Sequence, residues 1–185
     1  MVTDSPPDQA PRASSGPALP PEDAGRDLGL CIAGDGAWLY HGSPIHRMQL
    51  VKLFASVLRR EADGSYWLVT PVERGRIAVE DAPFVAIELA RTGEGSGQQL
   101  RVRTNLDEWV SIGPQHPIRL RRPAGVAADS GPAPYVEIRD GLEARVARSV
   151  YYELVDLAEE RLVDGRARIG VWSEGHFFAL DEQGA

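Results

Sequence analysis

The stretch that decides the fold is the segment 45–69, which reads IHRMQLVKLFASVLRREADGSYWLV. The segment 146–170, VARSVYYELVDLAEERLVDGRARIG, aligns with it without a gap at an offset of 101 residues. Both segments place an apolar helical face before the same Asp-Gly turn, so the chain is predicted to contain an internal duplication. The identical pairs are Arg47/Arg148, Leu53/Leu154, Arg60/Arg161, Asp63/Asp164 and Gly64/Gly165.

Each copy is predicted to begin with one helix. In the first copy the helix covers about 46–60, because Leu50, Leu53, Phe54, Val57 and Leu58 follow the helical i, i+3, i+4, i+7, i+8 spacing. Ser43 is expected to cap it, with Pro44 near its first turn. The second helix is predicted over about 147–162. Short strands bounded by turn residues are expected at 37–40, 65–70, 76–79, 84–90, 99–104, 109–112, 118–121, 135–139, 142–146, 168–172 and 176–180.

These elements predict an α+β fold made of duplicated β-helix-β-β units. In each unit an antiparallel sheet is expected to pack one face on its helix, and the strands in 84–122 extend the second unit at its front. Residues 1–27 are rich in proline and lack aromatic residues, so we predict a disordered tail there. The predicted domains are then 28–82, an N-terminal α/β domain, and 83–185, a C-terminal domain.

The charge of the chain argues against a general electrostatic grip on duplex nucleic acid or an anionic membrane. The 185 residues carry a net charge of −7, of which the 1–27 tail contributes −3 from five acids and two arginines. All basic residues except Lys52 are arginine. Codon bias explains that choice, and so does a role of some arginines as planar, bidentate anion ligands. The sequence leaves both explanations open.

Several classes of site and location are excluded or unsupported. Cys31 is the only cysteine, which rules out an intrachain disulfide and disfavours a cysteine-based metal site, so no cofactor is expected. No apolar run is long enough to span a membrane and no secretory signal is visible, so a cytoplasmic location is expected. The glycine cluster 93–97 predicts a hairpin tip rather than a phosphate loop. No catalytic motif is present, so nothing in the sequence predicts an enzyme.

The first candidate site is the junction between a strand and a helix at 41–47. Backbone N–H groups at a helix start favour anions, and His41 and Arg47 are placed to add polar contacts. The alternative is a capped helix with solvated side chains. Because a helix start disfavours a cation, the arginine at both helix starts, Arg47 and Arg148, requires an explanation.

Further candidates cluster around predicted turns. Thr70 and Glu73 flank one end of the first hairpin, and Glu80 and Asp81 follow its other end. Paired carboxylates can perform acid–base chemistry, but the pattern favours a surface turn or an ion pair to arginine. The remaining polar candidates are Thr104, Asn105, His116, Arg119 and Arg139, which offer hydrogen bonds or positive charge to a ligand; the arginines also suit a solvated edge strand.

The chain resembles the proteobacterial family of the domain of unknown function 1285 over about 30–182. The resemblance implies a duplicated α/β core and a C-terminal domain superficially similar to pleckstrin-homology barrels. It also implies a cleft between the domains for a nucleotide-like ligand, and a role in signalling. At Gly42-Ser43 the family pattern leads us to expect Asn-Gly. The matching stretches are WLYHGSPI (38–45), LVKLFASVL (50–58), YWLVTPVE (66–73), VEDAPF (79–84), TN (104–105), HP (116–117), PY (134–135) and GLEAR (141–145).

Three functions are consistent with these residues. The first is a non-enzymatic sensor that binds a small, nucleotide-like anion between the domains, and Trp67 or Tyr151 can stack on a base in it. The second is a protein-interaction module without a small ligand. The third is a hydrolase that uses Glu73, Glu80, Asp81 and His116. In the first function the phosphates are held by Arg47, Arg119, Arg139 and Arg148, and His41, Thr104 and Asn105 supply hydrogen bonds.

Overall fold

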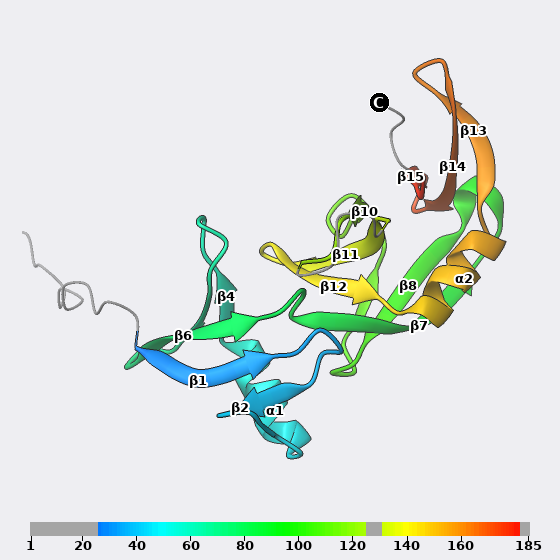
Figure 1. The fold of residues 1–185 in the computed structure, drawn as a ribbon. Helices are drawn as coiled ribbons and strands as arrows, with labels where there is room; N and C mark the ends of the chain where they lie inside the picture. The colour runs from blue at the N-terminus through cyan, green and yellow to red at the C-terminus, as the bar shows by residue number, and fades with distance from the viewer. Residues whose placement is uncertain (1–25, 125–130, 182–185) are drawn as a thin grey trace, which may run out of the picture.

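The computed structural model describes residues 26–124 and 131–181 (Figure 1). Two six-stranded sheets, one three-stranded sheet and two α-helices make up this part of the chain, which is an α+β architecture as predicted. The tail predicted to be disordered lies outside the described residues except for Arg26 and Asp27, and the first strand begins at Asp27.

The first unit is a mixed sheet with one helix. Its strands are ordered β3-β2-β1-β6-β5-β4, and β1 and β6 run parallel at its centre. The helix α1 connects β3 to β4, on the opposite edge of the sheet. The bounds are β1 Asp27–Ile32, β2 Trp38–Tyr40, β3 Ser43–Pro44, α1 Met48–Ser56, β4 Leu58–Arg60, β5 Tyr66–Val69 and β6 Arg74–Val79.

The second unit begins with a six-stranded sheet ordered β10-β11-β12-β7-β8-β9, in which β7 and β12 run parallel. The predicted hairpin tip is a short 3₁₀ turn over Gly95–Gly97. The bounds are β7 Phe84–Thr92, β8 Gln99–Thr104, β9 Trp109–Ser111, β10 Ile118–Arg121, β11 Ala133–Arg139 and β12 Leu142–Val146.

The chain ends in the helix α2, Arg148–Asp156, and an antiparallel sheet of three strands. These are β13 Glu159–Val163, β14 Arg166–Ser173 and β15 His176–Ala179. Figure 1 shows this sheet at the far end of the molecule from β1. Ser173 connects this sheet to the six-stranded sheet of the second unit, since its buried Oγ donates to the Ile112 carbonyl at 2.6 Å and accepts from the Leu100 N–H at 3.0 Å.

The predicted duplication is confirmed. In both units a nine-residue helix is followed by three strands, and the first of these strands begins at Leu58 and at Glu159, which are 101 residues apart. The repeated unit therefore has one strand more than the predicted β-helix-β-β pattern. The two larger sheets are also mixed rather than antiparallel throughout, because β1–β6 and β7–β12 are parallel pairs.

Both helices are shorter than predicted. The pattern from 46 to 60 continues an apolar helical period, but the helix ends at Ser56. Leu58 is then fully buried and pairs with Leu68 of β5, so strand pairing overrides the helical pattern after Val57. The predicted helix over 147–162 ends at Asp156 in the same way.

The predicted start of the first helix is wrong as well. Ser43 and Pro44 pair with β2 as a strand, and Arg47 occupies the cap position without a side-chain hydrogen bond. The buried face of α1 is Val51 and Ala55, whereas Leu53 is 60% exposed. Two turns present only a narrow buried stripe, so the broad face expected from the sequence is not used in full.

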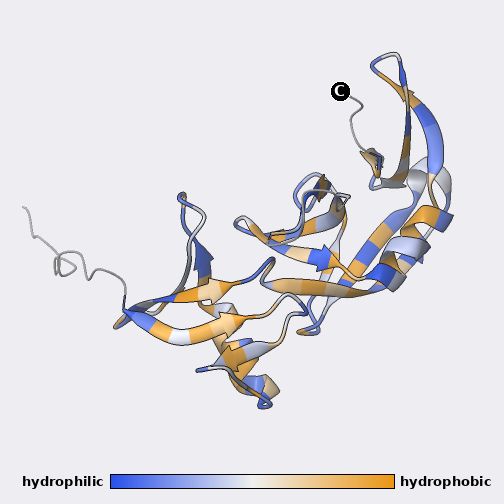
Figure 2. Ribbon diagram, in the orientation of Figure 1, coloured by the Kyte–Doolittle hydropathy of each residue, from blue (hydrophilic) through white to orange (hydrophobic). Residues whose placement is uncertain are grey.

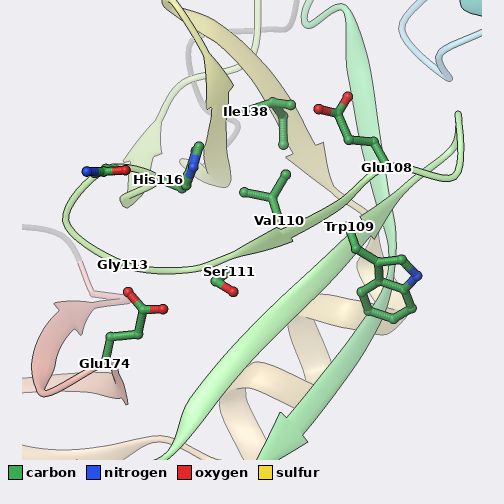
Figure 3. A pocket seen from close by; sticks show the side chains of 9 residues that line it. Glu108, Trp109, Val110, Ser111, Gly113, His116, Ile138 and Glu174 are labelled. Atoms are coloured by element: carbon green, nitrogen blue, oxygen red, sulfur yellow. The ribbon is translucent and has the colours of Figure 1, made fainter.

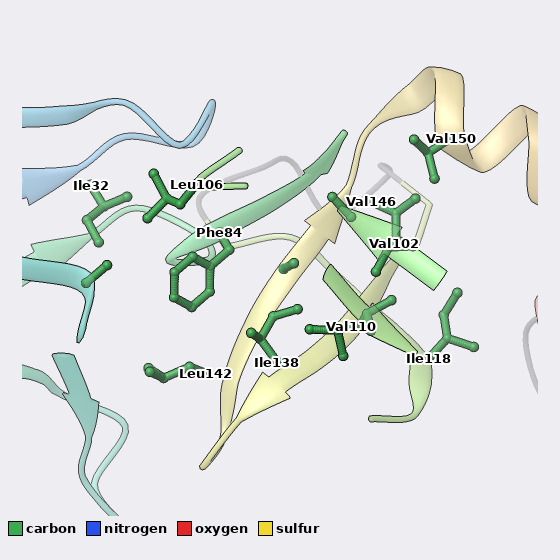
Figure 4. Close-up of a cluster of buried hydrophobic side chains, with 14 of the residues drawn as sticks. Ile32, Phe84, Val102, Leu106, Val110, Ile118, Ile138, Leu142, Val146 and Val150 are labelled. Carbon is green, nitrogen blue, oxygen red and sulfur yellow. The ribbon is translucent and has the colours of Figure 1, made fainter. Parts of the chain in front are cut away.

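The two units share one hydrophobic core. Ile32 of the first unit belongs to the same buried cluster as Phe84 and Leu142 of the second (Figure 4). Figure 2 shows that α1, β1 and β7 are rich in apolar residues, while β13 is mostly polar. Burial of apolar surface between the units therefore fixes their relative placement.

Candidate functional site

A cavity of about 540 Å³ lies where the start of α2 faces the loop after β1, and we call it the α2 cleft. The first unit contributes the loop residues Gly34 and Asp35, and the second unit contributes the remaining wall. The cleft therefore lies between the two units. Its lining residues are Gly34, Asp35, Val85, Pro132, Ala133, Pro134, Arg145, Val146, Ala147, Arg148 and Tyr151.

Two arginines give the α2 cleft its positive charge. Arg148 is the first residue of α2, its side chain is exposed, and it has no ion pair among the residues that the structure describes. The first turn of α2 holds no acidic residue, so its backbone N–H groups add to the positive potential. Tyr151, one turn further along, lines the same cavity. Two guanidinium groups and an aromatic ring thus line one cavity at the start of α2.

Arg145 forms an ion pair with the buried carboxylate of Asp81. Its Nη1 lies 3.6 Å from Oδ2 of Asp81, whose side chain is 4% exposed. The hydroxyl of Tyr135 donates to both oxygens of Asp81, at 2.9 and 2.7 Å. Arg121 donates to Oδ1 at 3.2 Å and stacks on the Tyr135 ring, and the Ala124 N–H donates to Oδ1 at 3.1 Å. Asp81 is therefore a structural hub next to the cleft.

Tyr135, the tyrosine that donates to Asp81, has a raised pKa. Burial, with the hydrogen bond to Asp81, raises the pKa of Tyr135 far above its ordinary value. The hydroxyl therefore stays protonated at physiological pH and remains a donor to the carboxylate. Charge-assisted hydrogen bonds of this kind satisfy a buried carboxylate, which is costly to leave unpaired.

Arg139 contacts residues of both units at a place other than the α2 cleft. It donates to Glu108 at 2.6 Å and to the Ala55 carbonyl at 3.0 Å, and it lies over the Phe84 ring. It borders a second cavity of about 340 Å³, beside Lys52 of α1. Because its donors already bind protein acceptors, Arg139 ties the end of α1 to the second unit rather than facing the α2 cleft.

Thr104 and Asn105 also hold the protein together. The Oγ1 of the fully buried Thr104 accepts from the N–H groups of Leu106 and Glu108 in its own turn. Asn105 accepts from the Val85 N–H at 3.0 Å and donates to the Gly36 carbonyl of the first unit at 3.2 Å. The hydrogen-bonding groups predicted to face a ligand are thus used between and within the units.

His116 lines a third cavity of about 400 Å³, which lies within the second unit (Figure 3). Its Nδ1 is 3.2 Å from the Glu137 carbonyl oxygen, and Glu108 and Glu174 approach the cavity from two other sides. Glu174 accepts from Gln99 at 3.0 Å. No group of three or more histidine, cysteine or carboxylate side chains suited to a metal ion occurs in the described residues.

The four residues of the predicted hydrolase are not brought together. His116 lines the third cavity, whereas Glu73, Glu80 and Asp81 line none of the three cavities described above. Thr70 and Glu73 close a local turn, in which the Thr70 Oγ1 bonds to the backbone of Glu73. Glu80 accepts from the Gly34 N–H at 2.8 Å, and Asp81 is the buried hub. The alternative expected from the sequence, an ion pair to arginine, describes Asp81.

Three further candidates lie on the surface outside these cavities. The His41 ring packs against Tyr40 and over Gly29, where even a methyl group would overlap it. Arg47 is exposed at the start of α1, and Arg119 pairs with Glu137 at 3.5 Å. The Arg74 guanidinium lies over one face of the Trp67 ring, and the ring N–H donates to Ser65.

Sequence reasoning missed part of the α2 cleft. In the sequence, Arg145 stands out only within the matching stretch 141–145, although buried and more exposed residues alternate along β12 and its buried positions are Leu142, Ala144 and Val146. That alternation places Arg145 on the opposite face, toward the cleft. No sequence pattern marks Gly34 and Asp35 as site residues, because they line the cleft only once the two units pack together.

The comparisons with known proteins agree with this architecture. The family model described as the N-terminal domain of DUF1285, a domain of unknown function, matches 19–82, and the model of its C-terminal domain matches 83–180. No curated protein matches the chain.

Two crystal structures of DUF1285 family proteins are similar. One, from Silicibacter pomeroyi DSS-3, is 43% identical with a TM-score of 0.76, covering 91% of this chain and 89% of the other. The second, from Shewanella baltica OS155, is 29% identical with a TM-score of 0.52, covering 70% and 91%. Among the described helices, neither has the length and apolar character needed to cross a membrane. The family models and the duplicated fold confirm the resemblance seen in the sequence: the chain belongs to the DUF1285 family.

Proposed function

We propose that this protein is a non-enzymatic binding or sensor protein that takes a small, nucleotide-like anion into the α2 cleft. The observation that carries the proposal is Arg148, an exposed arginine without an ion pair among the described residues, at the start of a helix and in one cavity with Arg145 and Tyr151. The helix dipole mildly disfavours a cation at this position, and an anion bound in the cleft would offset that cost. Arg47, at the start of α1, lines none of the three cavities described above.

The shape and composition of the cleft support a small organic ligand. Its volume of about 540 Å³ lies within the range typical of small-molecule sites. Tyr151, Val85 and Val146 offer apolar surface beside the two guanidinium groups. An anionic group near Arg148 with an aromatic or apolar body toward Tyr151 fits this arrangement.

The family resemblance adds two points to this proposal. We propose that the protein has a role in signalling, and that its second unit resembles pleckstrin-homology barrels. We place the function in the bacterial cytoplasm, since a single cysteine needs no oxidising compartment. On β1, partial burial raises the pKa of the Cys31 thiol, which favours a packing role over a nucleophilic one.

A thermal-shift screen of nucleotides tests the proposal. A ligand at 100 times its dissociation constant stabilises the folded protein by about 2.7 kcal/mol. We expect Arg148→Gln to remove the shift. The matched control is Arg47→Gln, which changes the equivalent arginine of the first unit and lies outside the described cavities, so the shift is retained. No shift across the panel, or equal effects of both substitutions, contradicts the proposal.

The alternative is a protein-interaction module, and one observation favours it. Leu162 of β13 is 73% exposed and Ile169 of β14 is 52% exposed, on the same face of the outermost sheet. A partner protein would cover this face. A pull-down that returns one stoichiometric partner, lost in Leu162→Ser and unaffected by Arg148→Gln, supports this function instead.

A further inference from the structure

We infer that the α2 cleft selects ligands with a single negative charge on an apolar or aromatic body, and that the buried Asp81 sets this preference. The inference rests on the proposed function and names its ligand class. The inference follows from the ion pairs that the charged residues of the cleft make with other parts of the protein. The charged residues that line the cleft are Asp35, Arg145 and Arg148.

The position of Arg145 limits the charge that it offers to a ligand. Its side chain is 39% exposed on the side of the cleft, and its other side meets Oδ2 of Asp81 at 3.6 Å. Asp81 is nearly inaccessible, so water does not screen this attraction as it does at the surface. Drawing Arg145 fully toward a ligand would weaken the pairing of a buried carboxylate, which is strongly unfavourable.

Asp81 cannot move to release Arg145. The Tyr135 hydroxyl of β11, and Arg121 and the Ala124 N–H at the end of β10 and just after it, all donate to its carboxylate. Only Ala82 and Pro83 separate Asp81 from β7, which begins at Phe84. The carboxylate is therefore a fixed negative charge behind the wall of the cleft.

Of the two arginines that line the cleft, Arg148 is the one left unshared for a ligand. Arg148 has no carboxylate within ion-pair distance among the described residues, whereas Arg145 is shared with Asp81. The exposed Asp35 adds a negative charge to the lining of the cleft. A ligand with one negative charge matches Arg148, and each additional charge meets no further unshared cation. The apolar wall formed by Val85, Val146 and Tyr151 favours a correspondingly apolar body.

Two adenosine nucleotides with the same base test this preference. Cyclic 3′,5′-AMP is a phosphodiester with one negative charge, and AMP is a monoester that carries nearly two at neutral pH. Isothermal titration of the full chain at constant ionic strength is expected to give about tenfold tighter binding of cyclic AMP. Arg148→Gln is expected to abolish the binding of both nucleotides.

The substitution Asp81→Asn tests the cause. It removes the charge that holds Arg145, so the affinity for AMP is expected to rise about tenfold relative to cyclic AMP. The matched control is Glu143→Gln, which removes a partner of Arg121 at 2.9 Å but leaves the contact between Asp81 and Arg145. This control is expected to keep the wild-type order of affinities.

The outcomes separate the inference from the proposed function. Tighter binding of AMP than of cyclic AMP to the wild type overturns the inference and leaves the proposed function standing. An unchanged order in a folded Asp81→Asn variant overturns it too. The wild-type comparison needs no substitution, so the inference remains falsifiable if that variant does not fold. Absence of binding by both nucleotides contradicts the proposed function, and the inference fails with it.

Discussion

Replacing Asn105 by alanine removes a side chain that connects the two units of the fold. Its Oδ1 accepts from the Val85 N–H at 3.0 Å, and its Nδ2 donates to the Gly36 carbonyl at 3.2 Å. Val85 belongs to β7 of the second unit and Gly36 to the loop after β1. The substitution therefore breaks a link between segments 69 residues apart in sequence.

The size of the effect follows from the two hydrogen bonds. Each contributes about 1 kcal/mol net, and an unpaired group left in a partly buried place costs about 1–3 kcal/mol. We expect Asn105→Ala to lower the free energy of unfolding by about 2 kcal/mol. For a chain of this size the melting temperature then falls by about 4–8 °C. The buried surface is almost unchanged, so the urea m-value is expected to stay constant.

Urea denaturation followed by tryptophan fluorescence measures this change. The control is Lys52→Ala, which removes an ion pair with Asp107 at 2.7 Å that also joins the two units. Because both groups of that pair are largely exposed, its loss is expected to shift the midpoint very little. A midpoint of Asn105→Ala equal to that of the wild type, or a larger effect of Lys52→Ala, refutes the assignment of Asn105 as the connecting residue.

Three other substitutions give independent tests. Ser173→Ala removes two fully buried hydrogen bonds that fix the outermost sheet, so a loss of about 2 kcal/mol is expected in urea denaturation, and an unchanged midpoint contradicts it. Tyr135 has a raised pKa in the folded state. Its contribution to the free energy of unfolding is therefore complete below about pH 10 and declines above it. Stability above pH 10 should therefore fall more steeply in the wild type than in Tyr135→Phe, and parallel curves would count against this. Lys52, with help from Arg103, lowers the pKa of Asp107, so the stability from that carboxylate is present above about pH 4 and is lost as the pH falls through the lowered value. The difference in the free energy of unfolding between the wild type and Asp107→Asn should then disappear in acid. A difference that stays constant with pH would show that the ion pairs of Asp107 do not contribute to stability.

Much of the local structure was predictable because short-range patterns specify it. The strand β10 has the predicted bounds 118–121, and the duplication was visible from a shared helix face and a shared Asp-Gly turn. The strands β4 and β13 were not predicted, because the residues after each helix continue its apolar period. Only the pairing of Leu58 with Leu68 across the sheet shows that the helix has ended.

The candidate site was less predictable, because its contacts join distant segments. Asp81 meets Tyr135 across 54 residues of sequence and Arg121 across 40, and no local pattern encodes such pairs. Arg139 and Asn105 were expected to bind a ligand, since exposed and engaged side chains look alike in a sequence. Arg148 was singled out by its match to Arg47, but the structure gives the two arginines different surroundings, and only Arg148 lines the cleft.

The central claim is that the α2 cleft binds an anion through Arg148. The most direct test is a crystal structure of the protein with the nucleotide that gives the largest thermal shift. The account predicts the phosphate group within hydrogen-bond distance of the Arg148 guanidinium, with the base toward Tyr151. A phosphate bound elsewhere, such as beside His116 or Arg47, with the α2 cleft empty, would contradict it.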